Sequence, residues 1–343
     1  MRRVSILMLG LLLFIGASML HAHPYAEREE VRSFIRDMAE RHGFKHRELA
    51  QLFARTQRLE AVLKAIRPSS DARSRTWSDY RALFLSQARI DVGLAFWDAQ
   101  RETLARAERD FGVPAAYIVA IIGVETFYGR ATGRWSVIDA LTTLAFDYPP
   151  RRKFFLGELE NYLLYTRSAG IDVFSVKGSY AGAIGIPQFM PGSYLRYAID
   201  FDGDGVVDLR ESPADAIGSV ANFLKEHGWR REGMLLLDAE VPGSGHERYA
   251  GGEMRPRHTL EELAKAGVAP RLETGAREVP ADTLAVLVEL QNAGRASEFR
   301  LGFQNFYVLT RYNRSAIYAA AVHDLAQALS AAQPGEDAVE AEE

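Results

Sequence analysis

Apolar residues recur every three or four positions over most of this chain, which is the spacing of an amphipathic helix. The pattern is repeated throughout 25–111, where we expect a run of helices with a break at 68–70 and one or two long helices over 80–111. The same spacing predicts further helices over 154–170, 214–227 and 306–329. The pattern therefore indicates a mainly helical fold.

One stretch, PAAYIVAIIGVETFYG at 114–129, is apolar at nearly every position and carries a single charge, Glu125. We expect a helix there, with Pro114 in its first turn and Gly129 at its end, buried on most sides. Burial disfavours an ionised carboxylate, so it should raise the pKa of Glu125, as a general acid requires. Two alternatives remain open at this point: Glu125 pairs with an arginine, or it points out of the helix end.

The pattern changes in 233–303, where continuous apolar runs replace the helical spacing. These runs predict a small α+β insert, so that the fold class is mainly α with α+β character. Its expected elements are strands over 234–241, 284–290 and 296–303, a short helix over 260–266 and a loop over 243–252.

The first 22 residues have the layout of a secretory signal peptide. Arg2 and Arg3 precede an apolar run that reaches about Leu20, and Ala22 offers a small residue for cleavage. A retained membrane anchor is the alternative, because the run approaches spanning length. The chain contains no cysteine, which excludes disulfides and a lipid-modified cysteine. We therefore expect a soluble, exported protein.

The composition excludes few classes of protein. The 343 residues are 48% hydrophobic and 25% charged, as in ordinary globular proteins, and suffice for two or three domains. The formal net charge is −4, and it becomes about −6 without the predicted signal peptide. Because there is no basic excess, we expect no nucleic-acid partner.

Residues 200–211 match the twelve-residue calcium loop of an EF-hand. Calcium prefers hard oxygen ligands, and the loop provides one at each expected position, with Gly205 at the sharp turn. An ordinary acidic turn is the alternative, which the full set of ligands disfavours. Because the loop is a single copy, we expect a structural ion. We expect no organic cofactor. The predicted ligands are Asp200, Asp202, Asp204, the Val206 carbonyl, Asp208 and Glu211.

Two other segments are candidates for ligand contact. Residues 175–197 combine glycines, which permit close backbone approach, with aromatic side chains that stack on sugars or bases. The alternative is a packing loop between helices. Three adjacent cations at 151–153 stand at a predicted helix start, where they bind an anionic group or simply form a solvated face.

Together these segments resemble the lytic murein transglycosylase B family over about residues 25–329. The likeness rests on ordered motifs with compatible spacing: GVETFYG at 123–129, PPRRKFF at 149–155, KGSYAGAIGIPQFMPGSY at 177–194, the calcium loop with DAIGSVANFLKEHGW at 215–229, and NFYVLTRYN at 305–313.

The resemblance implies a lysozyme-like helical core with a helical N-terminal domain and a small β-containing domain. The expected domains are a signal peptide at 1–22, a helical N-terminal domain at 23–110, a catalytic core at 111–232 containing the calcium loop, a small α+β domain at 233–303, a C-terminal helix at 304–330 that completes the core, and an acidic disordered tail at 331–343.

The resemblance also implies cleavage of the β-1,4 bond between N-acetylmuramic acid and N-acetylglucosamine in peptidoglycan, leaving 1,6-anhydromuramoyl ends. It identifies Glu125 as the single catalytic acid and base. A second carboxylate is not required when the sugar's own 6-hydroxyl is the nucleophile. The residues it assigns to substrate binding are Arg151, Arg152, Ser179, Tyr180, Gln188, Tyr312, Asn313 and Tyr318.

The chain departs from the family at Phe223, where a tyrosine is frequent, which puts one ring-hydroxyl contact in doubt. Its lack of cysteine resembles the soluble members, so we expect a periplasmic monomer without a stable membrane anchor. Glycan strands of peptidoglycan are the expected partner, with other cell-wall enzymes as further candidates. Two alternatives stay open: a hydrolytic lysozyme using Asp139 or Asp147, and a non-catalytic, calcium-dependent wall-binding protein.

Overall fold

The computed structural model describes residues 25–67, 76–272 and 278–333. The predicted signal peptide and most of the predicted acidic tail lie outside these residues. The chain divides into two compact units, 1–57 and 58–343. The domain boundaries expected from the sequence, including the one at residue 110, stay predictions.

The smaller unit contains two helices, α1 (Glu29–His42) and α2 (His46–Arg55), after a short 3-10 turn at Tyr25–Glu27. Val31, Phe34 and Met38 are buried on one face of α1, as their spacing predicts. The ring of Phe34 lies edge-on against Phe53 of α2, with 5.9 Å between centroids. Aromatic packing between the two helices therefore holds this unit together.

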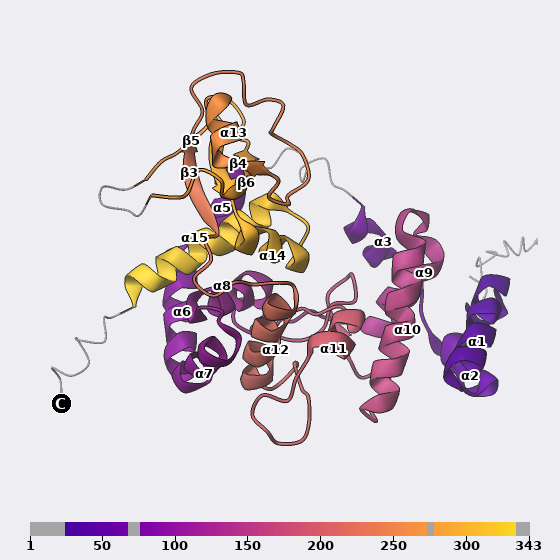
Figure 1. Cartoon of the computed structure of the whole chain (residues 1–343). Coiled ribbons are helices and arrows are strands. Elements are labelled where there is room, and N and C mark those ends of the chain that lie inside the picture. The colour runs from indigo at the N-terminus through magenta and orange to yellow at the C-terminus, as the bar shows by residue number, and fades with distance from the viewer. Residues whose placement is uncertain (1–24, 68–75, 273–277, 334–343) are drawn as a thin grey trace, which may run out of the picture. The chain divides into compact units, whose positions relative to one another are not determined.

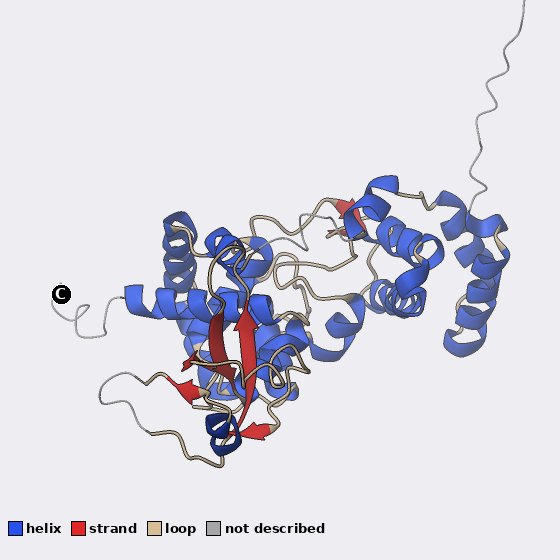
Figure 2. Ribbon diagram, turned by 90° about the horizontal axis from the view of Figure 1, so that it is seen from above, coloured by secondary structure: helices blue, strands red, loops and turns tan. Residues whose placement is uncertain are grey.

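The larger unit is built mainly of helices (Figures 1 and 2). They are α3 (Glu60–Ile66), α5 (Trp77–Phe84), α6 (Gln87–Ala99), α7 (Arg101–Phe111), α8 (Ala115–Thr126), α9 (Val137–Asp147), the 3-10 turn η2 (Pro149–Arg151), α10 (Arg152–Ser168), α11 (Pro191–Tyr197), α12 (Pro213–Glu226), α13 (Leu260–Lys265), α14 (Gln304–Tyr312) and α15 (Ala316–Ala332).

Three of the helix predictions were wrong in detail. The expected one or two helices over 80–111 are three, because the backbone leaves helical geometry at Leu85 and again at Gln100. The expected single C-terminal helix is divided into two helices, because the backbone at Asn313 is extended. The Ser315 hydroxyl then accepts a hydrogen bond from the amide of Tyr318 and caps the start of α15. Helix α15 also continues to Ala332, beyond the expected start of the tail.

Helix α8 lies at the centre of the helical part of this unit, in contact with α6, α7, α12 and α15. Nine of its twelve residues are buried, among them Ile118, Ile121 and Ile122 with no exposed surface. A helix that is apolar on all sides has to be enclosed in this way. The most apolar stretch of the sequence is therefore the element around which the other helices pack.

The strands of the larger unit form two antiparallel sheets, a two-stranded one and a five-stranded one of order β4-β6-β7-β3-β5 (Figure 2). The predicted strand over 284–290 is confirmed to the residue, and the other two are confirmed with shorter bounds. The strands are β1 (Trp135–Ser136), β2 (Lys177–Gly178), β3 (Leu236–Glu240), β4 (His258–Thr259), β5 (Ala269–Pro270), β6 (Leu284–Leu290) and β7 (Glu298–Gly302).

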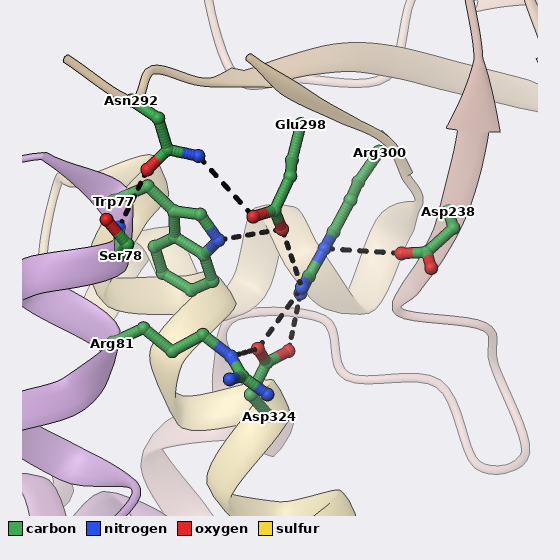
Figure 3. Close-up of polar contacts among 8 residues, drawn as sticks. All are labelled: Trp77, Ser78, Arg81, Asp238, Asn292, Glu298, Arg300 and Asp324. Carbon is green, nitrogen blue, oxygen red and sulfur yellow. Dashed lines mark hydrogen bonds and ion pairs between the residues drawn. The ribbon is translucent and has the colours of Figure 1, made fainter. Parts of the chain in front are cut away.

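A network of charged side chains joins the five-stranded sheet to helices α5 and α15 (Figure 3). Asp324 of α15 is buried and accepts hydrogen bonds from Arg300 of β7 at 2.5 Å and from Arg81 of α5 at 2.6 Å. Trp77 donates its indole N–H to Glu298 at 2.9 Å. Buried ion pairs of this kind specify how elements dock, because removing one partner leaves the other charge unpaired.

Candidate active site

Glu125 is the penultimate residue of α8. The helix ends at Thr126 and not at Gly129 as expected, because Phe127 and Tyr128 adopt left-handed backbone conformations with φ of 51° and 59°. Pro114 immediately precedes the first helical residue and is not in the first turn. The earlier end leaves the Glu125 side chain at the last turn of the helix.

Within the described part of the chain, the carboxyl group of Glu125 has one hydrogen-bond partner, the hydroxyl of Tyr318 on α15, which donates to Oε1 at 2.6 Å. Burial raises the pKa of Glu125 to about 7, and the hydrogen bond from Tyr318 partly opposes this rise. Among the described residues no arginine or lysine forms an ion pair with Glu125, so the alternative of a structural ion pair is wrong. The carboxyl can therefore hold or release a proton near neutral pH.

Two tyrosines lie near this carboxyl, and a third lies near one of them. The pKa of Tyr318 and that of Tyr312 are both raised well above the usual value, by burial first and then by the negative charge of Glu125. Tyr312 donates its hydroxyl to the carbonyl of Pro187 at 2.5 Å. Tyr80 of α5 lies close enough to Tyr318 to affect its pKa as well. Because both hydroxyls stay protonated, Tyr318 remains a hydrogen-bond donor to Glu125.

The sequence did not single out Tyr80, because its segment has no motif and was interpreted as a helical scaffold. Its apolar neighbours at helical spacing were the only signal available. Asn313, which the resemblance assigns to substrate binding, directly follows Tyr312 and is exposed. Only the packing of α5 against α15 brings Tyr80 to the tyrosine cluster.

The Gly-rich segment uses several of its predicted site residues to hold its own backbone. Gln188 has a left-handed φ of 53°, and its amide donates to the carbonyls of Gly185 and Thr132 at 2.8 and 3.0 Å. The Ser179 hydroxyl accepts the amide of Ala183 at 3.0 Å. The ring of Tyr180 is 40% exposed and free for stacking. The segment is thus a preformed loop with one open aromatic surface.

The two predicted arginines lie at the start of α10. The guanidinium of Arg151 stacks over Phe154, 4.3 Å from the ring centroid, and Arg152 donates to the Phe146 carbonyl at 3.2 Å. The alternative second carboxylate Asp147 is engaged by Arg58 at 3.3 Å. Asp139 lies in the first turn of α9 and contributes to the pKa of Tyr162. Both arginines are exposed. Neither aspartate is among the groups that shift the pKa of Glu125.

The calcium loop is only partly arranged as predicted. The carboxylate oxygens of Asp200, Asp202 and Asp204 lie within 4.8 Å of one another. Asp208 instead forms an ion pair with Arg210 at 3.1 Å, and Glu211 is not part of the group. The three gathered carboxylates are the hard oxygen donors that calcium prefers, so these residues fit the ion.

A buried carboxylate fastens this loop to the helix that follows it. Asp215 of α12 has no exposed surface and accepts the amides of Phe201 and Asp208 at 2.7 and 2.8 Å. Its pKa is raised by burial, and the two amide hydrogen bonds oppose that rise. The loop is therefore shaped by the protein as well as by any ion it binds.

Comparison with known proteins places this site in a family. The model of the Transglycosylase SLT domain matches residues 26–327, which is most of the chain. The chain belongs to this family. The fold class and the resemblance predicted from the sequence are thereby confirmed.

Relatives of this family match over nearly their full length. The membrane-bound lytic murein transglycosylase B of Escherichia coli K12 is 37% identical over 320 residues, which cover 90% of this chain and 85% of the relative. The soluble lytic transglycosylase SltB1 of Pseudomonas aeruginosa is 44% identical with a TM-score of 0.80, over 88% of this chain and 99% of that one. Escherichia coli Slt35, solved in complex with calcium, is 38% identical with a TM-score of 0.78. The match covers 90% of this chain and 95% of the Slt35 chain.

Within the residues that the structure describes, no helix of this family member has the length and hydropathy needed to cross a membrane. The segment predicted as a signal peptide falls outside those residues. Its role as a signal or an anchor stays a prediction.

Proposed function

We propose that Glu125 is the single catalytic acid and base of a peptidoglycan lytic transglycosylase. The observation that carries this proposal is its carboxyl group, which has a pKa near 7 and one polar partner, the protonated hydroxyl of Tyr318. An acid that must first give and then take a proton works best when its pKa is near the working pH.

In the first step Glu125 donates its proton to the glycosidic oxygen between N-acetylmuramic acid and N-acetylglucosamine, and the C1–O bond breaks. In the second step the 6-hydroxyl of the muramic acid residue attacks C1, and the Glu125 carboxylate removes the hydroxyl proton. The product is a 1,6-anhydro ring, and Glu125 is again protonated. The attack is intramolecular, so no second carboxylate is required to activate water.

Tyr318 supports both steps through its hydrogen bond to Oε1. A hydrogen bond to an ionised group is stronger than one to a neutral group, so it stabilises the carboxylate that exists between the two proton transfers. Burial favours the protonated form that begins the cycle. Together the two effects bring the two forms of Glu125 close in free energy.

The predicted binding residues are assigned to the glycan strand on the same basis. Tyr180 presents an open ring for a sugar face, and Ser179 and Gln188 hold the loop that carries it. Arg151 and Arg152 are placed to receive lactyl or peptide carboxylates. Tyr312, which is close enough to Glu125 to have its pKa raised by that charge, and Asn313 beside it complete the proposed set of glycan contacts.

The same proposal includes a structural calcium ion at Asp200, Asp202 and Asp204, and a monomer exported to the periplasm. The ion would tie the loop at 200–211 together and take no part in the proton transfers. Substrate partners are glycan strands of peptidoglycan, with other cell-wall enzymes as further candidates.

Digestion of purified peptidoglycan followed by mass spectrometry of the products tests the proposal. Lytic transglycosylase activity gives 1,6-anhydromuramoyl ends, whereas a hydrolytic lysozyme gives reducing ends that have gained one water. Products of the second kind without the first would refute the proposal. A Glu125→Gln variant that folds, binds peptidoglycan and releases no product excludes the non-catalytic wall-binding alternative.

A further inference from the structure

The chain that follows Glu125 adopts an unusual turn. Phe127, Tyr128 and Gly129 are consecutive and all left-handed, with φ of 51°, 59° and 83°. Large side chains disfavour this region, so the surroundings must maintain the turn. Part of that support is steric, because Gly93 and Gly123 leave the space that the Tyr128 ring occupies and a side chain at either would overlap it.

Backbone hydrogen bonds from the amides of Phe127 and Tyr128 to the end of α8 also hold the turn. A further support is a buried side-chain hydroxyl, that of Thr126, which is 1% exposed. It accepts the amide of Gly129 at 2.9 Å and donates its proton to the carbonyl of Ile186 at 2.7 Å. The carbonyl of Ile122 lies farther away, at 3.3 Å, as in ordinary bonding back along a helix. Thr126 therefore joins the left-handed turn to the Gly-rich segment.

The carbonyl that accepts the Thr126 hydroxyl belongs to Ile186, within the Gly-rich segment at 175–197. The next residue, Pro187, accepts the hydroxyl of Tyr312. The amide of Ile186 donates to the carbonyl of Leu209 at 2.8 Å, inside the calcium loop. A series of direct hydrogen bonds thus connects the residue beside Glu125 to the Gly-rich segment and to the loop at 200–211.

We propose that Thr126 is a positioning residue for Glu125. Its hydroxyl fixes the end of α8 relative to the Gly-rich segment, so that the Glu125 carboxyl stays in place for both proton transfers. The proposal rests on the proposed role of Glu125. Thr126 does not touch the reacting atoms. Its loss leaves the Gly129 amide and the Ile186 carbonyl without their partner, so the turn relaxes and Glu125, one residue away, shifts. A displacement on the order of 1 Å lowers a rate about a hundredfold.

Thr126→Val tests this, because valine keeps the shape of threonine and removes the hydroxyl, and Thr126→Ser restores the hydroxyl. We expect Thr126→Val to lower kcat on the order of a hundredfold, with KM little changed. Thr126→Ser should recover most of that loss. The matched control is Thr166→Val in α10, a buried threonine whose hydroxyl bonds only to carbonyls of its own helix. It should alter thermal stability without altering kcat.

Equal kcat values for Thr126→Val and the wild type would overturn the proposal, as would a loss that Thr126→Ser does not recover. If no variant without the hydroxyl folds, amide hydrogen exchange of the wild type decides. Slow exchange at Gly129 supports the bond to Thr126, and rapid exchange there refutes it. Glu125→Gln is assayed in parallel. If Glu125→Gln is active, the proposed function is contradicted. If Glu125→Gln is inactive and Thr126→Val is fully active, only the proposed role of Thr126 is contradicted.

Discussion

Replacing Glu125 by glutamine should stabilise the folded protein at alkaline pH while it abolishes activity. In the unfolded chain the carboxyl has its ordinary pKa of 4.5, and in the folded protein burial raises that pKa to about 7. As pH rises between these two values, the unfolded state releases a proton that the folded state retains. The wild type therefore loses stability over this interval.

The size of the effect follows from the two pKa values. The interval from 4.5 to about 7 corresponds to about 3 kcal/mol in the free energy of unfolding. This is an upper value, because Glu125 keeps part of its surface in contact with solvent. Glutamine carries no charge at any pH, and its carbonyl can still accept the hydroxyl of Tyr318. The variant therefore avoids the penalty of burying a carboxylate.

Urea denaturation of both proteins at pH 4, 6 and 8 measures the difference. We expect nearly equal stability at pH 4 and a gain for Glu125→Gln that grows to about 3 kcal/mol at pH 8. Glu226→Gln, an exposed position on α12, controls for the loss of a formal charge. A difference between variant and wild type that is constant over this pH range would refute the argument, and so would a variant less stable than the wild type at pH 8.

Three further predictions concern Tyr318, the calcium loop and the charged network around Asp324. Tyr318→Phe removes a hydrogen bond that lowers the pKa of Glu125. The alkaline limb of the pH profile of kcat/KM should therefore move up by about one pH unit. An unchanged alkaline limb would contradict the role proposed for Tyr318. Excess calcium should raise the melting temperature of the wild type by roughly several degrees, and it should not raise that of Asp204→Asn. Calorimetry with and without a chelator measures this difference. An unchanged melting temperature of the wild type would count against a bound ion. Asp324→Asn leaves Arg300 without its buried partner and should lower the free energy of unfolding by about 3 kcal/mol, measurable in urea; a neutral effect would mean that the network does not hold the sheet in place.

The stability of the fold and the proposed catalytic role of Glu125 place opposite demands on this site. The same burial that makes the carboxyl a useful acid at neutral pH destabilises the fold once the proton is lost. The hydrogen bond from Tyr318 limits this cost, because it stabilises the ionised form. The site therefore requires a well-packed helix around it, which α8 provides.

Much of the fold follows from local pattern in the sequence. Helical spacing located most helices, and a continuous run of apolar residues gave the bounds of β6. The apolar stretch 114–129 predicted both the burial of a helix and the raised pKa of its one acid. These features depend on the chemistry of neighbouring residues, which is why the sequence alone determined them.

Tertiary structure alone decided the hydrogen-bond partner of Glu125. The hydroxyl of Tyr318 donates to Glu125 across 193 positions of the chain, a contact that the sequence did not predict. The role of Tyr318 in substrate binding stays a prediction. Likewise Asp208 matched a metal-ligand position but pairs with Arg210. At the end of helix α8, the Thr126 hydroxyl donates to the carbonyl of Ile186, 60 residues away in the chain. Contacts of this range arise from how elements pack, and no periodicity along the chain encodes them.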